Sequence, residues 1–390
     1  MILVNSLGKK FMKKPINVLM LSALIATSPA SADIAFNGFA SIVAGATTSS
    51  DEQLWGFGDS DYFKPGSLFG LQVSSDLSEG LSVTAQIIGR GADDWDPKFE
   101  WAYLGYRVND SLKVLVGRQR APLYMYSDFL DVSYAYPWIT PPRGVYDLPL
   151  DSIDGVSAVY DFELGEFSST LHVVYGANTD EINAFGETIK PDFDDIFGAA
   201  FTANKDWLTL RAAYFTAEST LPLAATQPLV QGWQMTPFAE VANSITLTKK
   251  DTSFAELGFQ LDFDSFFIVG EYTELQIKDS FYPKEKSSYI MAGYRFSDKV
   301  AHITFGQDES SVNRITGTVP YGLDPTLDYL KAQTDGLADS QANDTNYVTI
   351  GLRWDFHDSA ALKFEYSDYQ DDLDSNADAG LFKVGLVTVF

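Results

Sequence analysis

The chain has 390 residues with 53 acidic and 27 basic side chains, a formal net charge of −26 and no cysteine. So acidic a chain repels nucleic acid, and the lack of cysteine excludes both a disulfide framework and a thiolate metal site. No apolar run after the N-terminal segment approaches the roughly 20 residues that a membrane-spanning helix needs.

The first segment, residues 1–32, has the layout of a cleaved signal peptide. Four lysines between Lys9 and Lys14 precede an apolar run from Val18 to Ala26, and Ala30-Ser31-Ala32 follows as a cleavage site. The apolar run is too short to be retained as a membrane anchor. We therefore expect an exported protein whose mature domain covers residues 33–390.

From about Ile34 onward, apolar residues recur at every second position. The clearest segment runs from Phe382 to Phe390. One face carries Phe382, Val384, Leu386, Thr388 and Phe390, and the other carries Lys383, Gly385 and Val387. The same alternation occurs in 208–214, 255–263 and 347–356. A period of two predicts β-strands with one apolar face, and about 9 to 11 such residues cross a membrane.

The connections between these strands alternate between short and long. Unpaired backbone groups cost several kcal/mol in lipid, so the first strand must pair with the last. We predict an all-β fold, a transmembrane antiparallel β-barrel of about sixteen strands. A soluble sandwich or propeller also has many short strands, but neither needs this alternation. Seven turns lie near 78–80, 109–111, 164–166, 204–206, 264–265, 297–299 and 357–359, and eight longer connections near 46–66, 91–97, 121–154, 178–195, 219–250, 278–286, 311–345 and 372–378.

The connection 121–154 is rich in aromatic residues and proline. Gly117-Arg118-Gln119 precedes it, and Asp151-Ser152-Ile153 closes it, with Tyr160 following. At these positions the chain resembles the Gram-negative general porin family, whose third loop folds into the barrel and constricts the channel. The likeness extends over the mature chain, from Phe36-Asn37-Gly38-Phe39 to Phe390.

The chain also departs from that family in two loops. Residues 136–143 stand where the family has a Pro-Glu-Phe-Gly-Gly centre, which affects the size and shape of the pore. The connection near 91–97 is short for the latch that joins neighbouring subunits in the family.

The resemblance implies an outer-membrane pore for passive diffusion of ions and small hydrophilic solutes, without a cofactor. It also implies a homotrimer in contact with outer-membrane lipid and lipopolysaccharide. The terminal Phe390 is similar to the signal that the barrel-assembly machinery reads.

In such pores, basic residues of the wall face acidic residues of the loop and create a transverse field. Lys363 and Lys383 also fall on the inward register. Arg118 shares its register with Val114 and Val116, so it needs a bulge at Gly117, or a position above the hydrocarbon, to serve the pore. Any one arginine could instead be a structural lumen residue paired with an acid. The candidate constriction residues are Arg90, Arg107, Arg118, Arg120, Asp128, Asp131, Arg143, Arg211, Arg295 and Arg353.

A substrate-selective porin is the main alternative, because aromatic residues of the loop could form a stacking track for a sugar or oligosaccharide. The candidates for that track are Tyr124, Tyr126, Tyr134, Tyr136 and Trp138.

An enzyme is not predicted. His172 and His302 fall on separate strands and His357 in a turn, so no Ser/His/acid constellation is formed. The acidic runs 192–195 and 368–374 could bind divalent cations that bridge to lipopolysaccharide, or could simply be solvated, and we assign no metal site. An adhesin or phage receptor needs fewer strands, so surface recognition would be a secondary role.

Overall fold

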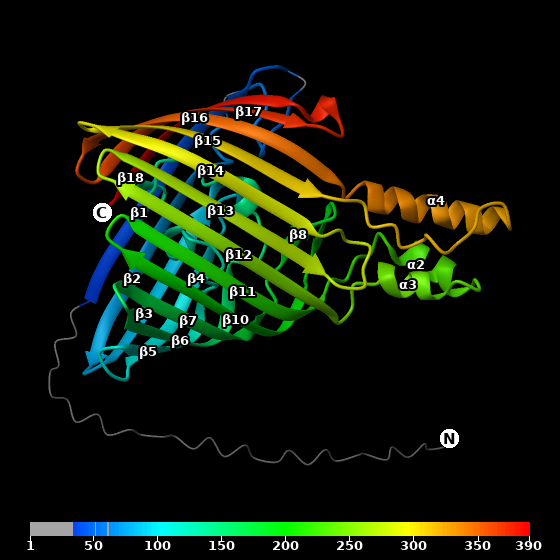
Figure 1. Ribbon diagram of the computed structural model, residues 1–390, viewed down its shortest axis with the longest axis horizontal. Coiled ribbons are helices and arrows are strands. Elements are labelled where there is room, and N and C mark those ends of the chain that lie inside the picture. The colour runs from blue at the N-terminus through cyan, green and yellow to red at the C-terminus, as the bar shows by residue number, and fades with distance from the viewer. Residues whose placement is uncertain (1–33, 51, 61) are drawn as a thin grey trace, which may run out of the picture. The chain divides into compact units, whose positions relative to one another are not determined.

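The computed structural model describes residues 34–50, 52–60 and 62–390, so the predicted signal peptide lies outside the described residues. Within these ranges, sixteen antiparallel strands form a closed barrel (Figure 1), which confirms the predicted fold class and strand number. The barrel strands are β1 (Ile34–Thr47), β2 (Leu68–Ser78), β3 (Leu81–Arg90), β4 (Pro97–Arg107), β5 (Leu112–Arg120), β6 (Ser152–Leu164), β7 (Phe167–Asn178), β10 (Asp192–Lys205), β11 (Leu208–Thr220), β12 (Lys250–Phe263), β13 (Phe266–Ile277), β14 (Glu285–Phe296), β15 (Lys299–Ser310), β16 (Asn343–His357), β17 (Ala360–Asp371) and β18 (Ala379–Val389).

The barrel closes where the first strand pairs with the last. β1 and β18 are in register from Phe39 opposite Val389 to Thr47 opposite Leu381. Beyond β18, the backbone N–H and C=O of Phe390 bond to Gly38. The sheet therefore has no free edge, as a β-structure in lipid requires.

Alternate side chains face outward and inward, as the two-residue period predicted. On β18, Phe382 is 58% exposed on the outer face, whereas Lys383 on the inner face is only 4% exposed. On β17, Phe364 faces outward, and Lys363 and Glu365 are buried inside. The outer surface is thus apolar and the inner surface carries the charges. None of the helices in the described residues is long and apolar enough to cross a membrane.

Short and long connections alternate around the barrel. In the part of the chain that the structure describes, seven turns of two to four residues join strands in pairs. We call the end of the barrel with these turns the turn end and the opposite end the loop end. The loop end carries the connections 48–67, 91–96, 121–151, 179–191, 221–249, 278–284, 311–342 and 372–378.

Several loop-end connections contain short elements that the sequence pattern did not predict. The helices α2 (Gln227–Gln234), α3 (Glu240–Ile245) and α4 (Pro325–Asp339) lie together beyond the strand ends (Figure 1). They pack around the buried Trp233, whose Nε1 donates to Thr334 Oγ1 at 2.8 Å. The added elements are the hairpin β8 (Ile182–Ala184) and β9 (Glu187–Ile189), the helices α1 (Arg143–Tyr146), α2 (Gln227–Gln234), α3 (Glu240–Ile245) and α4 (Pro325–Asp339), and the 3₁₀ turns η1 (Gly91–Asp93), η2 (Ser127–Phe129), η3 (Ser133–Ala135) and η4 (Ser375–Ala377).

Strands β4 and β5 separate near the loop end. Their pairing stops at Ala102 opposite Arg118, although β4 continues beside β3 and β5 continues beside β6. Glu100 is the extra residue of a β-bulge, because the register of β4 against β3 shifts on either side of it. At Gly117 the φ angle is 126°, and a Cβ there would lie 2.4 Å from the carbonyl oxygen of Ala102, so only glycine fits.

Candidate functional site

The connection between β5 and β6, residues 121–151, lies inside the barrel, and we call it the inserted loop. Lys363 on β17 is completely buried, and its ammonium group donates to the carbonyl oxygens of Ser133, Tyr136 (2.8 Å) and Trp138. Three carbonyl oxygens match the three N–H bonds of a lysine ammonium. Lys363 therefore holds the backbone of the loop directly against the wall.

Neighbouring wall residues hold the same segment. The Arg353 guanidinium on β16 donates to the carbonyl oxygens of Tyr134 (2.6 Å) and Tyr136 (3.1 Å). The Glu365 carboxylate accepts from the backbone N–H of Ile139 at 2.6 Å, and Trp138 Nε1 donates to Thr304 Oγ1 at 2.8 Å.

The first part of the inserted loop is fixed on other strands. Arg211 on β11 donates to the carbonyl oxygen of Pro122 at 2.6 Å. Glu271 on β13 accepts from the backbone N–H of Met125 at 2.8 Å. These bonds and those above attach the loop to the inner wall from β11 to β17.

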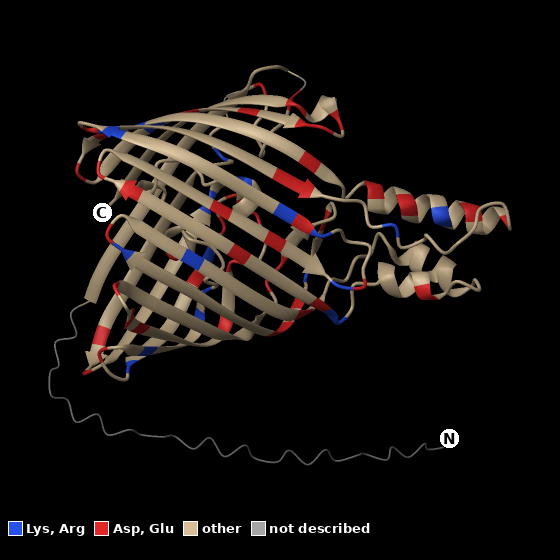
Figure 2. Cartoon of the chain, viewed as in Figure 1, with Lys and Arg blue, Asp and Glu red and all other residues tan. Residues whose placement is uncertain are grey.

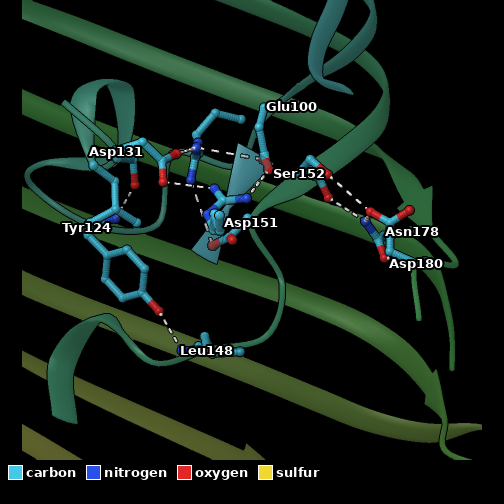
Figure 3. Close-up of polar contacts among 12 residues, drawn as sticks. Glu100, Tyr124, Asp131, Leu148, Asp151, Ser152, Asn178 and Asp180 are labelled. Atoms are coloured by element: carbon cyan, nitrogen blue, oxygen red, sulfur yellow. Dashed lines mark hydrogen bonds and ion pairs between the residues drawn. The ribbon is translucent and has the colours of Figure 1, made fainter. Parts of the chain in front are cut away.

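On the opposite wall, three charged residues of the strands and two of the loop form one cluster. Asp131 of the loop accepts from Arg90 on β3 at 2.8 Å and from Arg120 on β5. Glu100 on β4 accepts from Arg90 at 2.5 Å and lies 3.7 Å from Arg120. Asp151 lies 3.7 Å from Arg120. The labelled Glu100, Asp131 and Asp151 converge in Figure 3. We call these five residues the neck cluster.

The two loop carboxylates of the neck cluster titrate differently. Burial alone would raise the pKa of Asp131, but the adjacent Arg120 and Arg90 guanidinium groups outweigh it and lower that pKa below its ordinary value. For Asp151, burial dominates over the attraction of Arg120 and raises the pKa to about 6. The Asp151 side chain is surrounded by protein but still 42% exposed, so water in the lumen reaches it.

The structure brings some of the candidate constriction residues together. Arg90, Arg120 and Asp131 form the neck cluster, and Arg211 and Arg353 anchor the inserted loop. Basic side chains expected to face solute are thus occupied by the loop itself, and Lys363 is one of them. Lys383 is another: its Nζ donates to Thr140 Oγ1 of the loop at 3.1 Å and also lies 2.9 Å from Glu365 of the wall. Arg143, in the loop, has its guanidinium 5.7 Å from the centre of the Trp55 ring.

Four other candidates make no ion pair with the neck cluster, although Arg118 lines one cavity with Arg90 and Glu100, and Asp128 lines another with Arg120. Arg107 is exposed at the turn end of β4, and Arg295, at the turn end of β14, is paired with Asp262 at 2.8 Å. Asp128 is exposed and lines a cavity of about 440 Å³ together with His172.

Arg118 is the fourth of these residues. It remains opposite Ala102 and Asp154 without a register shift, so the unusual backbone at Gly117 does not bring it to the inward face. It pairs instead with Asp154, at 3.0 Å, and with Asp180 near the loop end.

Most of the aromatic candidates are buried, which is at odds with a stacking track. Tyr124, Tyr126, Tyr136 and Trp138 are between 2% and 7% exposed. Their rings pack on one another and on the wall, as with Trp138 and Tyr289, whose ring centres are 5.5 Å apart. Of the five, only Tyr134 is partly exposed, and its hydroxyl donates to the carbonyl oxygen of Asp358. These rings form the apolar core under the loop and present no open face to a solute.

Sequence reasoning missed Glu100 as a member of the neck cluster. No local signal marks it, because Phe99, Trp101 and Tyr103 alternate in the sequence without a break, and only the pairing of β4 with β3 reveals the bulge. Glu271 and Glu365 were also missed, since an isolated inward acid gives no indication that a loop will bind it. In the described residues, no group of three or more acidic or histidine side chains is placed to hold a metal ion.

Comparison with known proteins agrees with this architecture. The model of the Gram-negative porin family matches residues 19–387. No curated protein sequence matches the chain.

Three solved structures share the fold at low sequence identity. The outer membrane channel DcaP of Acinetobacter baumannii is 12% identical, with a TM-score of 0.59 over 93% of this chain and 99% of that one. OmpF of Salmonella typhi, in a complex with daunomycin, is 13% identical, with a TM-score of 0.58 over 92% and 97%. OmpT of Vibrio cholerae, folded in vitro in its trimer form, is 14% identical, with a TM-score of 0.52 over 92% and 99%. With the family model matched over nearly the whole closed barrel, the chain belongs to the Gram-negative porin family and is an outer-membrane β-barrel porin.

Proposed function

We propose that this porin is a passive channel for ions and small hydrophilic solutes, narrowed by the inserted loop. The observation that carries the proposal is the attachment of the loop to two opposite walls. Asp131 binds Arg90 and Arg120 on one side, and Glu271 on β13, across the barrel, accepts from the backbone N–H of Met125 on the other. A loop fixed at both sides sets a constant cross-section, so solutes are sorted by size.

Charge is the second filter in this proposal. The neck cluster contains two guanidinium groups and three carboxylates close together, which orders water across the narrow section. Passage needs only hydration and electrostatics, so we propose no cofactor and no enzymatic step.

A general pore is favoured over a sugar-selective one by the burial of the loop aromatics. A stacking track needs open ring faces, but Tyr136 and Trp138 are only 3% and 2% exposed.

We also propose that the porin works as a homotrimer in contact with lipid and lipopolysaccharide. The trimer form of Vibrio cholerae OmpT supports this assembly. Phe390 is suited to the recognition step by the barrel-assembly machinery, because its exposed ring continues the outward face of β18.

Planar-bilayer recording tests the function. The purified protein should insert in discrete steps, carry an ohmic current in KCl and remain unaffected by maltotriose. Saturable block by maltotriose would instead favour the sugar-selective alternative, and an absence of current steps would contradict a pore. The oligomer mass of unheated protein in detergent tests the trimer.

A further inference from the structure

The barrel wall is interrupted at the loop end between β4 and β5. The last paired residues of the two strands are Ala102 and Arg118. Towards the loop end, β4 reaches Pro97 beside β3 alone, and β5 reaches Arg120 beside β6 alone. In the described residues, the main-chain groups on the two sides of this gap therefore have no strand partner between them.

A cavity of about 560 Å³ occupies this gap. Part of its lining comes from the inner side of the barrel, where Arg90, Glu100 and Asp151 belong to the neck cluster. Another part comes from the outward register, with Phe99 and Arg118. Phe99 is 55% exposed, whereas the adjacent Glu100 is 6% exposed. Because residues from both faces of one sheet line the cavity, the cavity passes through the wall.

The cavity in the wall also borders the lumen. A second cavity, of about 590 Å³, lies between the inserted loop and the inner side of β1, β2 and β3. Arg90, Pro149 and Asp151 line both cavities, so these side chains form the boundary between the lumen and the gap. The Asp151 side chain is partly exposed, so water reaches this boundary.

The unpaired backbone excludes hydrocarbon from the gap. An unpaired N–H or C=O in lipid costs several kcal/mol, so irregular backbone at membrane depth is stable only where protein covers it or water fills the space. Charged side chains also line most of the gap, and charge is unfavourable in lipid. These charged residues are Arg90, Asp93, Lys98, Glu100, Arg118, Asp151, Asp180 and Glu181. Water is therefore the medium that fits the gap.

Polar contacts fix the outer edge of the gap. Arg118 pairs with Asp154 at 3.0 Å and with Asp180. Asn178 Nδ2 donates to Asp180 at 3.0 Å and to the carbonyl oxygen of Ser152 at 2.9 Å. Figure 3 shows Asn178 and Asp180 reaching towards Ser152. The edge is thus held open by its own side chains, and Asp180 remains 47% exposed there.

The gap lies near the level of the lipid headgroups. Charged positions are frequent in the connections at the loop end (Figure 2). Next to Phe99, the side chains of Lys98 and Asp93 pair at 3.2 Å and are 57% and 36% exposed. Such an exposed ion pair belongs to a hydrated surface and not to the hydrocarbon core.

We propose that the gap between β4 and β5 is a lateral opening of the pore, through which water and small ions pass between the lumen and the outer side of the wall. The proposal rests on the proposed pore function and adds a second entrance to the channel. The lateral opening and the mouth at the loop end meet at the neck cluster, so both routes lead to the same narrow section.

Thiol accessibility tests the opening in the unheated, reconstituted porin, whose natural chain contains no cysteine. Phe99→Cys places a thiol at the outer side of the gap, and its exposed position should leave folding intact. Modification with anionic sulfonatoethyl methanethiosulfonate should raise the K⁺/Cl⁻ permeability ratio by about twofold or more, because it adds a unit charge within a Debye length of the ion path. Cationic trimethylammonioethyl methanethiosulfonate should lower the ratio by a similar factor.

Ile87→Cys is the matched control. Ile87 lies on β3 directly opposite Phe99, at the same height, and is 37% exposed on the outer face of the closed part of the wall. Modification of its thiol should leave the permeability ratio unchanged.

The rate of modification, followed by mass spectrometry, is a readout that needs no current. The thiol of Phe99→Cys should react roughly tenfold faster than that of Ile87→Cys, because the reactive thiolate forms in water and not against lipid. A fast reaction in a protein that carries no current would contradict the pore function while retaining the opening. Equal rates in the two variants would overturn the proposal, as would a modified Phe99→Cys channel with an unchanged permeability ratio or an equal shift in Ile87→Cys.

Discussion

Replacing Lys363 by methionine should release the inserted loop while leaving the barrel folded. Lys363 is completely buried and donates to three loop carbonyls, those of Ser133, Tyr136 and Trp138. Methionine has a similar volume but no donor, so these carbonyls lose their partner. The strand pairing of β17 does not depend on the side chain.

The size of the effect follows from the chemistry of the lost bonds. A hydrogen bond to a charged group contributes about 1.5–3 kcal/mol, and the freed carbonyls recover part of this when they meet water in the lumen. A net loss of about 3 kcal/mol lowers the ratio of docked to undocked loop by more than a hundredfold. Arg353 and Glu365 still hold the segment, so we expect frequent opening rather than complete detachment.

Two measurements check this prediction. Single-channel conductance should rise and become noisier, and the hydrogen-bonded amides of Ala135 and Ile139 should lose protection in hydrogen exchange. Lys113→Met, which removes an inward lysine opposite Arg107 at the turn end of β5, is the control and should change neither. Unchanged conductance together with unchanged exchange in Lys363→Met would refute the assignment of this lysine as the loop anchor.

Three further predictions concern the neck cluster and the place where β4 and β5 separate. Asp131→Asn removes one of three carboxylates, so the reversal potential in a KCl gradient should shift towards anions, and stability to urea should fall by about 3 kcal/mol; an unmoved reversal potential would place the neck elsewhere. Because Asp151 has a pKa of about 6, it gains a proton as the pH falls, so cation preference should drop in a step near pH 6 that Asp151→Asn abolishes; persistence of the step in the variant would assign it to another group. Gly117→Ala, with φ at 126° and a Cβ 2.4 Å from a carbonyl oxygen, should destabilise the barrel by more than about 2 kcal/mol in urea unfolding. Gly165→Ala, at a φ of 64° with nothing within 4 Å, is its control, and equal losses in both would exclude the close contact as the cause.

The sequence by itself determined the barrel and its strand number. Alternation such as that from Phe382 to Phe390 is a local property, because successive side chains of any strand point to opposite faces. The polar turns between strands are local as well. Apolar and polar side chains alternate along the strands, and every backbone N–H and C=O must be paired in lipid. The sheet must therefore close into a barrel.

Only the tertiary structure decided what the inward charges do. The alternation placed Lys363, Arg353 and Arg211 inside the barrel but could not indicate that loop carbonyls would occupy them. It also left the loop aromatics without a role, and packing buried Tyr124 and Trp138 beneath the backbone that they support. These contacts join residues far apart in the sequence, so no local pattern encodes them.

The bulge at Glu100 and the burial of Asp308 also depend on the tertiary structure. Glu100 enters the neck cluster because β4 shifts its register against β3, and Asp308 is buried because Gly144 of the loop packs against it. Periodicity reports which face of a strand a residue occupies. Which charges meet on that face depends on where the loop folds back, and this is a property of the assembled barrel.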